Sequence, residues 1–154
     1  MGEAFIKRRK IAPPDYIMLD PTEGPKNGFS ITAYLGSAAY LSYYHAYMLY
    51  GSQQGGTFNA TTTRFDVKKY KRLHISGYMN QTQHNNGFVH FNLCDASGNI
   101  ISSKAFFHSD ITIDHNFSLS NIAANKNPLY LVIYSQASYN EAPNLFLTDI
   151  KLTQ

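Results

Sequence analysis

Hydrophobic and polar residues alternate regularly along the second half of the chain. The clearest case is ITIDHNFSL at positions 111–119. Successive side chains of a β-strand point to opposite faces, so this pattern predicts a half-buried strand. Ile113 and Phe117 are expected inside, and Thr112 and Asn116 outside. Similar alternation predicts further strands at RLHISGYM (72–79), GFVHFNLC (87–94), PLYLVIYSQ (128–136) and NLFLTDIKLT (144–153).

Turn residues between these segments indicate how the predicted strands connect. DASGN at 95–99 has Asp and Gly where a tight turn favours them, so GFVHFNLC and IISSKAFFHS (100–109) are expected to form a hairpin. Short strands, closely spaced turns and the lack of a long helical pattern predict an all-β fold. We expect an antiparallel β-sandwich of the jelly-roll type.

The tyrosine-rich stretch SAAYLSYYHAYMLYGS at 37–52 fits two secondary structures. Its rings recur at helical spacing at Tyr40, Tyr43, Tyr44 and Tyr47. Tyrosine is a better strand former than helix former, and the surrounding chain reads as strands, so a bent strand or a hairpin is favoured over a helix at 38–50. One face is expected to join the core, and the other to supply rings to a ligand or a neighbouring subunit.

Residues 1–28 are expected to form an irregular N-terminal arm outside the sandwich. The arm starts with a basic run at 7–10 and holds four of the six prolines of the chain, at Pro13, Pro14, Pro21 and Pro25. Proline breaks regular elements because it lacks a backbone N–H donor. We therefore predict the arm at 1–28 and a single β-sandwich domain at 29–154.

Charge and cysteine content exclude several classes of function. Only 15% of the 154 residues are charged, and much of the net charge of +3 lies in the run KRRK at 7–10, so we expect no nucleic-acid partner. The single cysteine, Cys94, excludes an intrachain disulfide. FIKRRKIAPPD does not resemble a signal peptide, and no apolar run has the length of a membrane span, so neither signal-directed secretion nor membrane insertion is expected.

Catalytic and metal-binding patterns are missing from the sequence. The three glutamates fall in the arm or in a loop, whereas glycoside hydrolysis needs two carboxylates flanking one bond. Cys94 and His90 lie about 13 Å apart if they share a strand, too far for a thiol nucleophile and its base. We expect no enzyme, no catalytic residue, no cofactor and no metal site. Two metal sites remain as alternatives. One would be formed by His74 and His90 facing each other across neighbouring strands, and the other would be a structural calcium site near Asp95 or Asp149.

The polar faces of the predicted strands suggest a carbohydrate site. Sugars stack their C–H faces on aromatic rings, and their hydroxyl groups bond to amide side chains. Tyrosines of β-proteins also often pack between sheets, and tryptophan, the usual sugar platform, is absent. The candidate carbohydrate-binding residues are Tyr78, Tyr134, Tyr130, His74, His90, Asn92, Gln83 and Asn85.

The order of segments resembles a known group of modules. RFDVKKYKRLHISGY, FVHFNLCDASGNIISSKAFF, ITIDHNFSLSNI, NPLYLVIYS and NLFLTDIKL follow one another as in jelly-roll modules of tail and baseplate-associated proteins of bacteriophages and prophages. MGEAFIKRR is similar to the start of many small tail-accessory proteins. The resemblance covers most of residues 64–154 and the first nine. Such modules are similar in shape to carbohydrate-binding modules.

The resemblance implies a non-enzymatic tail protein that binds a bacterial surface polysaccharide during host attachment. Its location would be the virion tail, assembled in the host cytoplasm with other phage tail proteins. The stretch at 37–52 departs from the pattern of these modules, so no family site is carried over to single residues. The alternative is a purely structural tail subunit whose tyrosine-rich surface forms a homo-oligomer interface.

Overall fold

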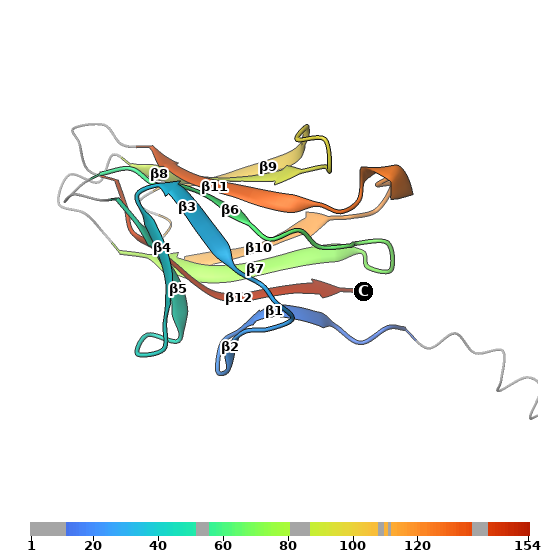
Figure 1. Ribbon diagram of the computed structural model, residues 1–154, viewed down its shortest axis with the longest axis horizontal. Helices are drawn as coiled ribbons and strands as arrows, with labels where there is room; N and C mark the ends of the chain where they lie inside the picture. The colour runs from blue at the N-terminus through green and yellow to red at the C-terminus, as the bar shows by residue number, and fades with distance from the viewer. Residues whose placement is uncertain (1–11, 52–55, 81–86, 108–109, 111, 137–141) are drawn as a thin grey trace, which may run out of the picture.

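The computed structural model describes residues 12–51, 56–80, 87–107, 110, 112–136 and 142–154. They form two antiparallel sheets, packed face to face as two layers (Figure 1). Apart from one 3-10 turn, η1 at Ala124–Lys126, every regular element of this part is a strand. The prediction of an all-β antiparallel sandwich is therefore confirmed.

The first sheet, called sheet A, has seven strands in the order β10-β7-β12-β1-β2, with β5 also beside β12 and β4 beside β5. Its strands are β1 (Tyr16–Asp20), β2 (Gly24–Pro25), β4 (Ser37–Leu41), β5 (Ala46–Tyr50), β7 (Arg72–Met79), β10 (Thr112–Ser118) and β12 (Leu145–Thr153). The second, sheet B, has the order β3-β6-β11-β8-β9. Its strands are β3 (Ile31–Leu35), β6 (Asn59–Thr62), β8 (Phe88–Cys94), β9 (Ile100–Phe107) and β11 (Tyr130–Gln136).

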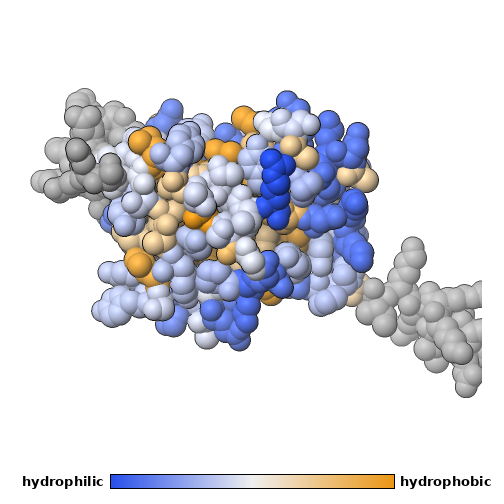
Figure 2. Space-filling model, in the orientation of Figure 1, coloured by the Kyte–Doolittle hydropathy of each residue, from blue (hydrophilic) through white to orange (hydrophobic). Residues whose placement is uncertain are grey.

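The hydrophobic core lies between the two sheets and follows the predicted alternation. Ile113 and Phe117 are 1% and 2% exposed, while Thr112 and Asn116, each next to one of them in the strand, face solvent, as predicted. From the edge of the sandwich, apolar side chains reach the surface only at scattered positions among hydrophilic ones (Figure 2). Most of the buried apolar side chains lie on the strands of the two sheets.

The domain boundary expected at residue 29 is corrected by β1. This strand pairs with β12 in sheet A, and its Met18 and Leu19 are 2% and 0% exposed in the core. Pro21 follows β1 and Pro25 lies in the short edge strand β2, where a missing N–H donor breaks no interior pairing. The prolines therefore flank β1 instead of interrupting it, and residues 16–25 belong to the sandwich.

The tyrosine-rich stretch forms a hairpin and not a helix. β4 and β5 pair along their length, and the turn at 42–45 contains His45 with φ of 50°. Tyr47 is buried, and its hydroxyl oxygen accepts a hydrogen bond from the backbone N–H of Ile31 at 3.1 Å. Tyr43 and Tyr44 in the turn are 86% and 50% exposed. The stretch thus supplies rings to both the core and the surface, but the exposed rings lie in the turn and not on one face of a strand.

No helix in the described ranges combines the length and apolarity that crossing a membrane requires.

Candidate functional site

The predicted site residues divide between the two outer faces of the sandwich. Tyr78 and His74 lie on β7, so they project from sheet A. The other described residues of the set project from sheet B and are Tyr134, Tyr130, His90 and Asn92. Gln83 and Asn85 lie outside the described residues. His74 and His90 therefore do not face each other, because β7 and β8 belong to different sheets whose polar sides point away from one another.

The outer face of sheet A arranges its side chains in four rows across β10, β7 and β12. The pairing of these strands sets the rows, since directly opposed residues on one face are close neighbours. From one end to the other, the rows are Thr112–Tyr78–Phe146, Asp114–Ser76–Asp149, Asn116–His74–Lys151 and Ser118–Arg72–Thr153. The face changes along its length from aromatic through acidic and amide groups to a cation.

The first row forms an aromatic platform. The rings of Tyr78 and Phe146 stack with centroids 4.8 Å apart and planes 6° apart. Tyr44, from the turn between β4 and β5, meets Phe146 edge-on at 5.6 Å, and Tyr43 meets Tyr44 at 5.0 Å. A side chain at Gly77 would collide with the carbonyl oxygen of Phe146, so this glycine allows β12 to approach β7 beneath the rings. The platform presents the exposed part of Tyr78 to solvent.

His74 is the centre of a hydrogen-bonded network in the second and third rows. Its Nδ1 donates to Oδ1 of Asn116 at 3.0 Å, because that oxygen can only accept, and its Nε2 is hydrogen-bonded to the hydroxyl of Ser76 at 2.7 Å. Carboxylates flank the ring on both sides, with Asp114 Oδ1 3.7 Å from Nδ1 and Asp149 Oδ2 3.7 Å from Nε2. These polar groups are held in fixed orientations before any ligand arrives.

A groove of about 460 Å³ runs along this face beside the network. It is lined by Asp15, Arg72, His74, Asn116, Lys151, Thr153 and Gln154. A second groove of about the same size adjoins it, since Arg72, Asn116 and Gln154 line both. The β1–β2 and β4–β5 hairpins extend below the layer of β7, β10 and β12, so they flank this face (Figure 1). The outer face of sheet A is therefore polar, with two shallow adjoining grooves and one aromatic end.

The outer face of sheet B carries a different group of rings. His90 and Tyr134 stack at 4.6 Å with planes 14° apart, and His90 Nε2 lies 3.3 Å from Oε1 of Gln136. Phe88 joins His90 at 4.7 Å and Phe107 at 5.8 Å. This row of rings crosses β9, β8 and β11 at one end of the sheet.

The remaining polar residues of sheet B are engaged locally. Asn92 Oδ1 accepts a hydrogen bond from the hydroxyl of Ser103 at 2.9 Å, and the guanidinium of Arg64 lies 4.8 Å from the ring centre of Tyr130. Sheet B therefore holds four of the predicted residues without the continuous polar network of sheet A.

The carboxylates of Asp95 and Asp149, the two positions considered for calcium, already contact other groups of the protein. Asp95 accepts hydrogen bonds from the backbone N–H of Ser97 and Asn99, both at 2.9 Å, and the bond from Asn99 is the main reason why its pKa is lowered. Asp149 lies 3.7 Å from Lys151 Nζ as well as beside His74. Within the described ranges, no group of three or more His, Cys, Asp or Glu residues is placed to hold a metal ion.

Cys94 does not have the environment of a nucleophile. The residue is 3% exposed, and burial, reinforced by the nearby carboxylate of Asp95, raises the pKa of its thiol. A nucleophilic cysteine needs the thiolate form, which a raised pKa disfavours. Cys94 is therefore a small core residue.

Phe146 belongs to the aromatic platform, although the sequence did not single it out, and Tyr44 from the tyrosine-rich stretch joins it there. Phe146 lies in NLFLTDIKLT, whose alternation changes phase, because a bulge between Leu147 and Asp149 shifts the register with β7. That break in the pattern was the available signal, since it places Phe146 and Asp149 on the same face. Tyr44 reaches the platform only through the folding of the β4–β5 hairpin.

Comparisons with solved structures identify carbohydrate-binding modules as structural neighbours. CBM29-2, a family 29 carbohydrate-binding module, in a variant complexed with cellulohexaose, matches with a TM-score of 0.57 and 10% identity over 90% of this chain and 89% of that chain. A variant complexed with mannohexaose matches with a TM-score of 0.56 and 9% identity, over 90% of both chains. CBM28, a module specific for non-crystalline cellulose, matches with a TM-score of 0.51 and 10% identity over 71% of this chain and 74% of that chain.

No family model matches the chain, and no curated protein matches it in sequence. At about 10% identity the structural likeness concerns the fold, and the reported neighbours carry no indication of a phage origin. The resemblance to tail proteins therefore stays a prediction. The chain has the jelly-roll sandwich fold of these carbohydrate-binding modules.

Proposed function

We propose that the chain is a non-catalytic module that binds a polysaccharide along the outer face of sheet A. The observation that carries this proposal is the adjacency of the Tyr78–Phe146 platform and the network around His74 on one grooved face. A sugar ring stacks its C–H face on Tyr78, while Asn116 and the carboxylate of Asp149 bond to the hydroxyl groups of neighbouring sugars. The shared fold with modules named for carbohydrate binding supports this proposal.

The length of the face suits an oligosaccharide more than a single sugar. From Arg72 to Tyr78 the strand advances six residues, which corresponds to about 20 Å at about 3.3 Å per residue. The two adjoining grooves extend over the Arg72 half of this length. We therefore expect a ligand of several sugars in an extended form.

A second part of the proposal concerns the biological setting of the chain. From the resemblance in segment order, we propose that the polysaccharide belongs to a bacterial surface and that the chain acts in host attachment within a phage or prophage tail, beside other tail proteins. A glycan array with bacterial capsular and lipopolysaccharide glycans beside plant glucans and mannans tests this point. Binding to plant polysaccharides alone would contradict the host-attachment part and leave carbohydrate binding in place.

Sheet B supports a second candidate function, that of a structural subunit with an oligomer interface. The row of Phe107, Phe88, His90 and Tyr134 leaves Phe107 57% exposed. Exposed aromatic rows of this kind are common at subunit contacts. Light scattering of the full chain without a glycan distinguishes the two functions. The second candidate predicts an oligomer, whose mass is a multiple of the 17.4 kDa chain mass, and its assembly needs no glycan.

Isothermal titration calorimetry of the full chain with cellulohexaose and with mannohexaose tests carbohydrate binding directly. The variant N116A removes a side chain of the His74 network, and N92A is its control on the other face, because Asn92 also lies mid-strand with one side-chain partner. We expect N116A to weaken binding by about 2- to 13-fold, equivalent to about 0.5–1.5 kcal/mol for one hydrogen bond, and N92A to leave it unchanged. The reverse result would refute the assignment to sheet A.

A further inference from the structure

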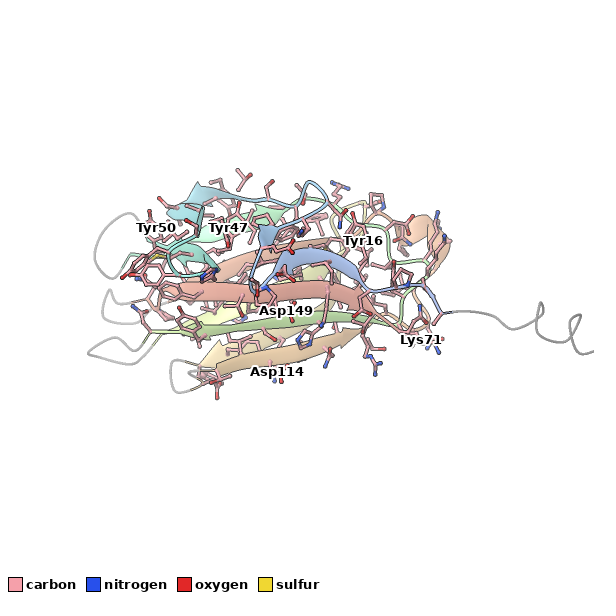
Figure 3. The ribbon with its side chains drawn as sticks, turned by 90° about the horizontal axis from the view of Figure 1, so that it is seen from below. Tyr16, Tyr47, Tyr50, Lys71, Asp114 and Asp149 are labelled. Carbon is pink, nitrogen blue, oxygen red and sulfur yellow. The ribbon has the colours of Figure 1, made fainter. Side chains whose placement is uncertain are left out.

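Two cations lie together at the end of the sheet A face that lies away from the aromatic platform. Lys71 and Arg72 are exposed at the start of β7. Among the described residues, neither forms an ion pair with an Asp or Glu side chain. Figure 3, which looks onto this face from below, shows Lys71 at the end of the molecule opposite Tyr47 and Tyr50. The cations and the tyrosine-rich hairpin thus occupy opposite ends.

The groove at this end contains cations and neutral polar groups. It has a volume of about 460 Å³ and is lined by Lys71, Arg72, Asn116, Ser118, Ser120 and Gln154. No Asp or Glu side chain is in this lining, whereas Asp15 lines the adjoining groove and Asp149 is paired with Lys151 and His74. The local charge of this groove is therefore positive.

Arg72 is well suited to hold an anion in the groove. One N–H of its guanidinium donates to the backbone carbonyl oxygen of Gln154, which fixes the side chain. The guanidinium has five donors, so others are free for a ligand, and its planar fork matches a carboxylate or a sulfate. Ser118 and Ser120 supply hydroxyl groups beside it for the hydroxyls of the same sugar.

We propose that the ligand of this face is an acidic polysaccharide, in which an anionic sugar substituent binds Lys71 and Arg72 while another sugar stacks on Tyr78. This inference rests on the proposed carbohydrate binding and specifies its ligand class. The distance of about 20 Å between the two ends of the face requires several sugars between the two contacts. A carboxylate at C6 of a hexose and a sulfate ester share the chemistry that the groove recognises.

Two pairs of matched ligands test the proposal with the full chain. Cellulohexaose is compared with its form oxidised to carboxylate at every C6, and mannohexaose with hexamannuronate, so each pair differs only in charge at C6. We expect at least one oxidised hexamer to bind about tenfold tighter than its neutral partner by calorimetry at ~20 mM salt, through charge-assisted hydrogen bonds. The difference should shrink at ~500 mM salt, because exposed charges are then screened.

Variants place the effect in the groove. We expect R72Q and K71Q each to weaken binding of the oxidised hexamer by about five- to tenfold and to change binding of the neutral one less than about twofold. The control is K104Q, which removes the same charge from β9 of sheet B and should change neither. An equal loss in K104Q would mean that only the net charge matters, and it would overturn the proposal.

The remaining outcomes are also decisive. Equal affinity for neutral and oxidised hexamers overturns the acidic ligand and leaves carbohydrate binding in place, whereas failure of every hexamer to bind overturns both. A C6-sulfated cellulohexaose distinguishes sulfate from carboxylate as the preferred anion, and tight binding of either one supports the proposal. A single-stranded DNA of equal charge that binds as tightly as the oxidised hexamer would show a general polyanion surface and refute recognition of a sugar.

Discussion

Replacing Tyr78 by Leu separates ligand binding from stability at the aromatic platform. Tyr78 is 36% exposed and stacks on Phe146 with ring centroids 4.8 Å apart. Leucine keeps an apolar side chain over Phe146 but removes the flat ring on which a sugar stacks. Binding is therefore expected to suffer more than folding.

The structure sets the size of both effects. One aromatic contact contributes about 0.5–1.5 kcal/mol beyond its buried area, so losing the sugar contact weakens affinity by about 2- to 13-fold. Losing the stack on Phe146 costs the fold a similar amount, part of which leucine recovers by packing. For a chain of 154 residues, 1 kcal/mol corresponds to about 2–4 °C, so Tm should fall by no more than about 6 °C.

The control variant is Tyr134→Leu, because Tyr134 stacks on His90 at 4.6 Å on the outer face of sheet B. Calorimetry with cellulohexaose and mannohexaose measures binding, and differential scanning calorimetry measures Tm. We expect Tyr78→Leu alone to weaken binding. If only Tyr134→Leu weakens it, the ligand lies on sheet B and the reasoning from the platform is refuted. If Tyr134→Leu instead changes the mass in light scattering, the oligomer interface gains support.

Three further predictions concern stability. Phe117→Ala should lower the free energy of unfolding by about 3–5 kcal/mol in a denaturant titration, since the ring is 2% exposed, and a loss below about 1 kcal/mol would contradict its core position. A chain that begins at Lys26 lacks β1 and should show no cooperative unfolding by circular dichroism; a sharp transition would mean that β1 is dispensable. Burial, with a smaller contribution from Lys104, lowers the pKa of His115 against the opposing effect of Asp114. The unfolded imidazole therefore takes up a proton at about 6.5 and the folded one only at lower pH, so stability should fall as the pH drops through this window. His115→Leu should flatten that part of the pH profile in urea titrations, and an unchanged profile would contradict the assignment.

The alternation of residues determined the strands and their inner faces. In β10 it correctly placed Ile113 and Phe117 in the core, because a strand that covers a core must bury every second side chain. The hairpin at DASGN was also predictable from the sequence, since its turn depends on neighbouring residues alone. In the structure β8 pairs with β9, and the Asp95 carboxylate accepts hydrogen bonds from the turn backbone. These are local properties, which each segment carries by itself.

Tertiary structure decided which strands share a sheet and therefore which polar faces form one surface. His74 and His90 both lie on the polar side of a strand, but β7 and β8 are in different sheets, which separates them to opposite faces. The same pairing brings Tyr78 beside Phe146, and Asn116 beside His74. The residues of these two pairs lie 68 and 42 positions apart in the chain, and no local pattern specifies such a register.

The N-terminal arm shows the same division between local and long-range information. Pro13, Pro14 and Pro21 correctly indicated irregular backbone, yet YIMLD between them forms β1. The edge of β12 offers backbone partners to this segment, and the core accepts Met18 and Leu19. The sequence by itself thus determined which residues face inward along the strands that alternate regularly. Only the tertiary structure decided which strands meet and which side chains share a surface, because both depend on hydrogen bonds between segments that are distant in the chain.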